Sequence, residues 1–229
     1  MDKRFWIFLA VVAVIFGGIL FATHQNKANS PSEGKGTLTK HLEGNNTTGV
    51  TLTEYGDYQC PACGQYYNPL KQVFAKYKDK ISFQFRNFPL YTLHPNAIAG
   101  ARAAEAADLQ GKFWQMHDKL YDENYTQQLA EAQGSTYATW TTASDPQSDF
   151  DDYAKTIGLN VAKFNTDFKS SLVNDRVQAD MKEGDRLGIN ATPTFFINGK
   201  KITSPDATLD AFSKVLDAAI AKQAADKKS

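Results

Sequence analysis

Both cysteines of this chain lie in one short stretch, Asp57-Tyr58-Gln59-Cys60-Pro61-Ala62-Cys63-Gly64. Residues 50–55 before it are rich in β-branched and aromatic side chains, which indicates a strand, whereas the apolar residues of 70–77 recur at helical spacing. Cys60 is therefore predicted at the N-terminus of a helix, where unpaired backbone N–H groups and the helix dipole stabilise a thiolate. Cys63, one turn further on, is close enough to form a disulfide with Cys60 or to resolve a mixed disulfide formed by it.

Two other interpretations of this Cys-x-x-Cys pair stay open. Zinc needs four ligands, and the chain has neither a second cysteine pair nor two histidines at metal-binding spacing. An inert structural disulfide would close so short a loop that it would constrain the unfolded chain little. We therefore favour redox chemistry that uses a Cys60–Cys63 disulfide and needs no metal ion or other cofactor.

Length and charge narrow the class of protein. At 229 residues the chain can form one domain with a full core and an appendage, and its 25 Lys and Arg residues balance 25 Asp and Glu residues. A formal net charge of zero gives no reason to expect nucleic acid as a partner. Partners must be inferred from motifs instead.

The N-terminus predicts where the protein works. Lys3 and Arg4 precede an uncharged run, residues 5–22, which as a helix would be about 27 Å long and close to the roughly 30 Å hydrocarbon core of a bilayer. The best small-x-small cleavage site has the large Leu20 at its first position, so residues 1–23 are interpreted as an uncleaved single-pass anchor, with a removed signal peptide as the alternative. Because Lys3 and Arg4 should stay cytoplasmic, the rest of the chain is expected on the oxidising, extracytoplasmic side, tethered to the cell membrane or, after cleavage, secreted or periplasmic.

The segments that flank the expected domain are polar. Residues 24–49 are predicted to be a flexible linker, within which residues 37–42 could add a short edge strand. In this linker His41 is most simply a solvated polar residue. The Lys-rich residues 223–229 are predicted to be a frayed C-terminus.

Residues 50–222 are predicted to form the folded domain. Residues 81–86 alternate apolar and polar side chains, as a strand does, and because a helix connects them to the preceding strand, the two strands should be parallel. Helical spacing then dominates about residues 95–188, which are interpreted as a helical insertion. Asn198-Gly199 supplies the positive φ values of a tight hairpin turn, and an amphipathic helix closes the domain.

Two histidines of the helical tract are not interpreted as ligands. His94, directly before Pro95, is expected in a turn or at a helix cap. His117 shares one helix face with Phe113 and Leu120, so it is expected to be a hydrogen-bonded histidine of the core.

The order of these elements and four short stretches resemble the DsbA-like family of thiol:disulfide oxidoreductases. The stretches are Asp57–Cys63, Arg86–Leu90 with His94-Pro95, Gly111–Trp114 and Gly188–Gly199. The resemblance implies an α/β fold of the thioredoxin type with an inserted helical subdomain. It also implies an enzyme that exchanges disulfides with exported or unfolded protein substrates and is reoxidised by a membrane-bound oxidoreductase.

The resemblance assigns further site residues. In the family, the proline before the penultimate strand has a cis peptide bond and faces the dithiol, which assigns substrate binding to Thr192 and Pro193. An acidic residue beneath the dithiol corresponds to Glu54, whose pKa would be raised and which would move protons for Cys63. The plain alternative for Glu54 is a glutamate that faces solvent.

One position of the active-site motif Cys60-Pro61-Ala62-Cys63 departs from the family. Many members have histidine directly before the second cysteine, where this chain has Ala62. The thiolate should therefore be less stabilised, which weakens oxidising power. We favour an oxidase, while a reductase or isomerase, and a non-catalytic peptide-binding holdase on the same fold, stay open.

Overall fold

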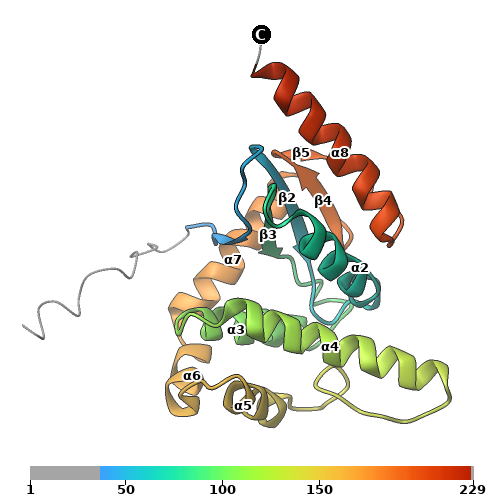
Figure 1. Ribbon diagram of the computed structural model, residues 1–229. Coiled ribbons are helices and arrows are strands. Elements are labelled where there is room, and N and C mark those ends of the chain that lie inside the picture. Colours follow the sequence, from blue (N-terminus) through green and yellow to red (C-terminus); the bar gives the residue numbers. More distant parts are fainter. Residues whose placement is uncertain (1–36, 228–229) are drawn as a thin grey trace, which may run out of the picture. The chain divides into compact units, whose positions relative to one another are not determined.

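A five-stranded sheet lies at the centre of residues 37–227, the part of the chain that the computed structural model describes (Figure 1). Its strands lie side by side in the order β1 (His41–Glu43), β3 (Ile81–Asn87), β2 (Val50–Gly56), β4 (Thr194–Ile197) and β5 (Lys200–Lys201). β2 and β3 are parallel, as predicted, and the other neighbouring pairs are antiparallel. The sheet is therefore mixed, and β2 is its central strand.

Two helices pack their apolar stripes on the same face of the sheet. These are α2 (Pro61–Tyr77), which directly follows β2, and α8 (Leu209–Asp226) at the end of the chain. Leu70 of α2, Phe212 of α8 and Leu52 of β2 belong to one buried apolar cluster. Burial of this stripe, rather than helix propensity alone, holds α2 against the sheet and so sets the position of its N-terminus.

The predicted helical insertion lies between β3 and β4. It consists of α3 (Ala97–Asp108), α4 (Phe113–Ala132), α5 (Gln147–Thr156), α6 (Val161–Phe168) and α7 (Ser171–Arg186). The polar stretch between α4 and α5 is a loop whose Trp140 is fully buried in the core. Figure 1 shows α4 passing beside α2, and α3 packs on α4, so the insertion reaches the Cys-x-x-Cys helix through α4.

The hairpin at the edge of the sheet confirms a turn prediction. Asn198 and Gly199 both have positive φ, 47° and 76°, and they connect β4 to β5. Asparagine and glycine adopt this region of φ at little cost, which is why this pair favours a tight hairpin turn.

The boundaries expected for the linker and the C-terminus need correction. The edge strand predicted within residues 37–42 is confirmed in part: β1, at the edge of the sheet, includes His41 and Leu42, extends to Glu43 and pairs with β3, so this part of residues 24–49 is not a linker. α8 continues to Asp226, well into residues 223–229, because the helical hydrogen bonds extend that far. The predicted anchor, residues 1–23, lies outside the described residues. Within residues 37–227, no helix combines the length and the apolar character needed to cross a bilayer.

The prediction that His41 is solvated is wrong. Its side chain is buried, Nε2 lies 2.6 Å from Oε1 of Glu105 in α3, and its ring stacks on Phe113 of α4 with the centroids 3.4 Å apart. Thr39 is also buried and donates its hydroxyl to Asp180 of α7. The segment before β2 is thus bound to the helical insertion by buried polar contacts.

Candidate active site

Cys60 caps the N-terminus of α2. Its backbone N–H donates to the Asp57 carbonyl oxygen at 3.1 Å, and its sulfur lies 3.4 Å from the carbonyl oxygen of Thr192. Pro61 occupies the first helical position, where a missing N–H costs nothing. Cys60 and Cys63 are both free thiols in the structure.

The two thiols have opposite electrostatic environments. A hydrogen bond from the Cys63 thiol, supported by the Cys63 backbone N–H, outweighs burial and lowers the pKa of Cys60 to about 6. Burial raises the pKa of Cys63 well above its ordinary value, and the thiolate of Cys60 and the carboxylate of Glu54 act in the same direction. The arrangement stabilises one thiolate and one thiol, without a histidine at Ala62.

Glu54 of β2 is buried beneath the dithiol, with 2% of its surface exposed. The alternative that it faces solvent is wrong, since its strand neighbours Phe85 and Phe195 belong to the central strands β3 and β4. Burial, together with the negative charge of Cys60, raises the pKa of Glu54 to about 8. This carboxyl can therefore hold or release a proton near neutral pH.

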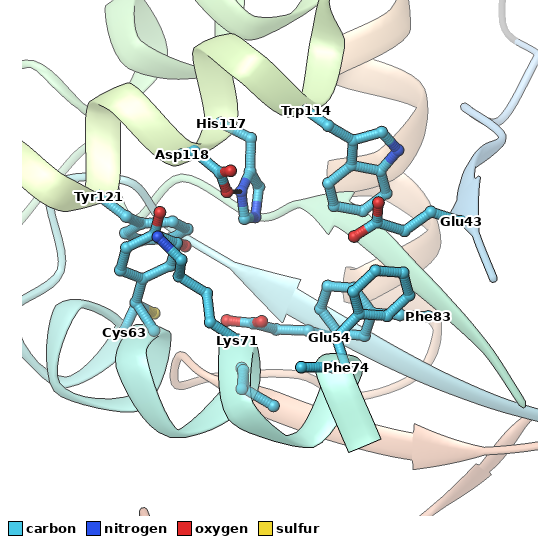
Figure 2. Close-up of a pocket in the computed structure, with 13 residues that line it drawn as sticks. Glu43, Glu54, Cys63, Lys71, Phe74, Phe83, Trp114, His117, Asp118 and Tyr121 are labelled. Atoms are coloured by element: carbon cyan, nitrogen blue, oxygen red, sulfur yellow. Dashed lines mark hydrogen bonds and ion pairs between the residues drawn. The ribbon is translucent and has the colours of Figure 1, made fainter. Parts of the chain in front are cut away.

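A pocket of about 210 Å³ between α2 and α4, called here the α2–α4 pocket, opens next to Cys63 and Glu54. Figure 2 shows the Glu54 side chain entering it from β2, with Tyr121 and His117 entering from α4. Its walls are mostly apolar and include Leu70, Phe74, Phe83 and Trp114. His117 is a buried core histidine, as predicted, and its Nδ1 lies 3.3 Å from Oδ1 of Asp118.

The loop that carries Thr192 and Pro193 lies beside Cys60. The peptide bond between Thr192 and Pro193 is cis, which confirms that prediction, and β4 begins at the next residue. Thr192 is buried and presents its carbonyl oxygen to the Cys60 sulfur. The structure thus brings the dithiol, Glu54 and this loop together from three separate parts of the chain.

Asp57 and His94 are site residues whose roles the sequence analysis missed. One carboxylate oxygen of Asp57 accepts the Gln59 N–H at 2.8 Å, while the other accepts the Leu90 N–H at 2.9 Å and lies 2.7 Å from Nδ1 of His94. The hydrogen bond with Asp57 raises the pKa of His94. His94 does lie in a turn, as expected, and the stretches matched by resemblance already contained both residues as a signal.

Amide side chains of α4 also hold the dithiol motif. Asn124 donates to the carbonyl oxygens of Tyr58 at 2.7 Å and Cys60 at 3.2 Å, and Gln128, one turn later, donates to that of Pro61 at 3.1 Å. Such amides on one face of a helix are a weak signal, because solvated helix faces carry the same residues. No cluster of three or more potential metal ligands occurs within residues 37–227.

Comparison with known proteins shows which family the chain matches and which solved structures share its fold. A family model described as Thioredoxin matches residues 36–218. The structure is similar to that of oxidised BdbD from Bacillus subtilis, with a TM-score of 0.62 and 24% identity over 80% of this chain and 92% of that one. It is also similar to alpha-DsbA1 from Wolbachia pipientis, with a TM-score of 0.66 and 19% identity over 88% of this chain and 98% of that one. At these identities the likeness concerns the fold.

Curated relatives are longer proteins. The chain is 35% identical over 167 residues to a protein of Mycolicibacterium gilvum named Na(+)/H(+) antiporter NhaA 1, a match that covers 72% of this chain and 24% of that relative. The chain thus spans about a quarter of that relative's length, and the activity of the whole relative is not carried over to it.

Proposed function

We propose that this protein introduces disulfides into exported proteins through Cys60 and Cys63. The chain belongs to the thioredoxin family, and it has the fold of the DsbA-like thiol:disulfide oxidoreductases of that family. One observation carries the proposal: the sulfur of Cys60 sits at the N-terminus of α2 and 3.4 Å from the backbone of Thr192. A reactive sulfur and a backbone segment that can pair with an extended chain are thereby adjacent.

The reaction is a two-step exchange. A thiolate of the substrate attacks the Cys60 sulfur of the oxidised protein, the Cys60–Cys63 bond breaks, and Cys63 leaves with the electron pair and takes a proton from Glu54. A second substrate thiolate then attacks the substrate sulfur of the mixed disulfide and displaces Cys60 as a thiolate. Two electrons pass from the substrate to the protein, and the substrate gains the disulfide.

The asymmetry of the dithiol supports the oxidising direction. A pKa of about 6 for Cys60 means that the reduced protein holds a stabilised thiolate at neutral pH. A stabilised reduced form makes the disulfide a stronger oxidant and Cys60 a better leaving group. The Cys63 thiol and backbone supply this stabilisation in place of a histidine at Ala62.

Apolar side chains beside the site suit unfolded substrates. Tyr91 and Leu93 lie in the loop after β3, with 59% and 71% of their surfaces exposed. The hydrogen bond from Leu90 N–H to Asp57 holds this loop against the residues that precede Cys60. Unfolded chains expose apolar residues that can contact such side chains before the thiols react.

The proposal places the dithiol domain outside the cytoplasm. Residues 1–23 would tether it to the membrane, which raises its effective concentration near a membrane-bound oxidoreductase that restores the disulfide. Detection by mass spectrometry of a mature N-terminus between Ala22 and Asn29 would contradict the tether.

Trapping experiments test the assignment of the two cysteines. A Cys63→Ser variant should accumulate mixed disulfides with exported proteins on non-reducing gels, because the bond to Cys60 can no longer be resolved. A Cys60→Ser variant should accumulate few, because Cys63 is buried and protonated. Equal trapping by both would contradict the assignment.

The direction needs a separate measurement. The described domain, equilibrated in glutathione buffers, should show a reduction potential above that of thioredoxin, about −270 mV, and shifted toward that of DsbA, about −120 mV. A potential near the thioredoxin value would support a reductase instead. If a Cys60→Ser, Cys63→Ser double variant kept the activity of the parent protein toward unfolded chains, that activity would not need the dithiol, and the result would support a holdase.

A further inference from the structure

We propose that the α2–α4 pocket binds a primary alkylammonium ion, either a free small amine or the side chain of a lysine residue, with Glu54 and Glu43 as its counter-charges. The pocket has a volume of about 210 Å³. A cavity of about 150 Å³ is large enough to hold a benzene molecule, so an organic ion of about five to eight non-hydrogen atoms fits here.

Aromatic side chains make up much of the pocket wall. They are Tyr67, Phe74, Phe83, Trp114 and Tyr121. The faces of such rings attract cations that come within about 6 Å of the ring centre. One of these rings already attracts a cation, because Nζ of Lys71 lies 4.9 Å from the ring centroid of Tyr67. An alkylammonium ion can therefore place both its carbon chain and its charge against the same wall.

The buried end of the pocket presents groups that can accept hydrogen bonds from an ammonium. Nε2 of His117 and the hydroxyl of Tyr121 are buried, line the pocket, and have no hydrogen-bond partner within residues 37–227, although buried polar atoms almost always have one. Burial lowers the pKa of His117, so its ring stays neutral, and Nε2 can accept while Nδ1 contacts Asp118. Figure 2 shows the Glu54 carboxyl pointing into the pocket below the His117 ring. These three acceptors match the three N–H donors of a primary ammonium.

The charges around the pocket favour a cation over an anion. Besides the tyrosines, the ionisable groups that line it are Glu43 from β1, Glu54 from β2, Cys63 and Lys71 from α2, and His117 and Asp118 from α4. Among these groups, Lys71 carries the positive charge, and its Nζ lies 3.8 Å from Oδ1 of Asp122, which does not line the pocket. With both glutamates ionised, three carboxylates therefore face the pocket against a single ammonium.

Binding of the ion should depend on pH through the two glutamates. Burial and the negative charge of Cys60 raise the pKa of Glu54 to about 8, while partial burial and the charge of Asp118 raise that of Glu43 to about 7. At pH 6 both carboxyls are mostly protonated and give the ion no counter-charge. A bound ammonium lowers both pKa values, so binding releases protons, and the affinity should increase as pH rises through 7 and 8.

Occupancy of the site should also respond to the redox state. Cys63 lines the pocket, and the negative charge of Cys60 already acts on Glu54. The reduced protein carries the Cys60 thiolate and the oxidised protein does not, so the cation should bind more tightly to the reduced form. By linkage the ion would stabilise the reduced form and make the disulfide a stronger oxidant. This coupling rests on the proposed dithiol chemistry, whereas the site itself does not.

Isothermal titration calorimetry on the full chain tests the site with n-butylammonium as the probe. The ion stays charged at pH 6 and pH 8.5, because alkylammonium groups such as that of lysine have a pKa of about 10.4. 1-Butanol is a neutral control of the same size, and butanoate carries the opposite charge. Titrations at both pH values, in two buffers that differ in ionisation enthalpy, give the affinity and the number of protons released.

Glu43→Gln is the test variant, and Asp122→Asn is the matched control, because Asp122 lies on α4 close to Lys71 but does not line the pocket. We expect the parent protein to bind butylammonium roughly tenfold more tightly at pH 8.5 than at pH 6, and not to bind butanoate. At pH 8.5 Glu43→Gln should weaken binding of butylammonium by roughly fivefold and release fewer protons. Its affinity for 1-butanol should not change, which shows that the cavity is intact, and Asp122→Asn should match the parent.

Peptides distinguish the two sources of the ion. A capped tripeptide with lysine at its centre is compared with one that has norleucine there. Binding of the lysine peptide would assign the site to side chains of protein substrates. Binding of butylammonium without binding of the lysine peptide would assign it to free small amines.

Equal affinities for butylammonium and 1-butanol, or a Glu43→Gln variant that binds butylammonium at pH 8.5 as tightly as the parent, would overturn the site. Equal affinities of the reduced and the oxidised protein would overturn its coupling to the redox state. Neither result bears on the proposed function, which fails instead if Cys60→Ser and Cys63→Ser leave disulfide exchange intact. Such a failure would in turn leave the site in place, because the calorimetry needs no enzymatic activity.

Discussion

Nδ1 of His94 lies 2.7 Å from the Asp57 carboxylate and so connects the two loops that meet at the dithiol. Asp57 lies three residues before Cys60 and accepts the Cys60 N–H on its backbone oxygen. His94 lies in the loop between β3 and α3, and the Leu90 N–H of the same loop donates to the same carboxylate. The residues directly before α2 are therefore held in place by His94, which lies 37 positions after Asp57.

Replacing His94 by glutamine should destabilise the protein in a pH-dependent way. The contact with Asp57 raises the pKa of His94 in the folded protein. The charged ring therefore contributes its full stabilisation at pH values below about 6.5, the pKa of histidine in the unfolded chain. This contribution is lost as pH rises through the higher pKa of the folded protein. We expect a loss of about 1–2 kcal/mol near pH 5.5 that shrinks in alkaline solution. Urea unfolding at several pH values measures it, and a loss independent of pH would show that the imidazolium is not involved.

The thiol of Cys63 should control the reactivity of Cys60. In the reduced protein, carboxymethylation of Cys60 should follow a midpoint near pH 6. A Cys63→Ala variant removes the hydrogen bond that lowers this pKa most, so its midpoint should rise by about one unit or more. Cys60→Ala should leave no thiol that reacts near neutral pH. An unchanged midpoint in Cys63→Ala would mean that the helix N-terminus alone stabilises the thiolate.

A Glu54→Gln variant should be more stable than the parent protein but less active. Burial raises the pKa of Glu54 to about 8. Between about pH 4.5 and pH 8 the unfolded chain has therefore lost this proton while the folded protein keeps it. The free energy of unfolding falls as pH rises through this range. Glutamine has no proton to lose, so the variant should be more stable than the parent by more than about 2 kcal/mol near pH 8. Resolution by Cys63 should slow in parallel. Thermal unfolding and glutathione kinetics on the same samples check both, and a less stable variant at alkaline pH would contradict the buried carboxyl.

A His41→Ala variant tests the buried contacts that bind β1 to the insertion. Burial opposes the charge on His41, but Glu105 at 2.6 Å outweighs it and raises the pKa. Removing the ring leaves part of Glu105 unsatisfied and exposes the face of Phe113, at an expected cost of about 3 kcal/mol. As for His94, the loss of stability should be largest in acid and should decrease as pH rises through the raised pKa of His41. Chemical unfolding at pH 5.5 and 8.5 distinguishes this pH-dependent loss of stability from a simple loss of packing, which would be the same at both pH values.

Local patterns were sufficient for most of the fold. The alternation in residues 81–86 predicted β3, Asn198-Gly199 predicted the hairpin, and the change from strand to helical spacing placed Cys60 at a helix N-terminus. These features depend on residues close together in sequence, whose side chains share one face or one turn. The burial of β1 was not predictable in this way, because three residues carry too short a pattern.

By itself, the sequence determined the elements, the dithiol and its place at the start of a helix, since hydrophobic period, turn residues and helix ends are local properties. Only the tertiary structure decided the chemistry of each group. Cys60 meets Thr192 across 132 positions, and His41 meets Glu105 across 64. A pKa depends on burial and on the charges within a few ångströms, and those neighbours are chosen by packing rather than by position in the chain.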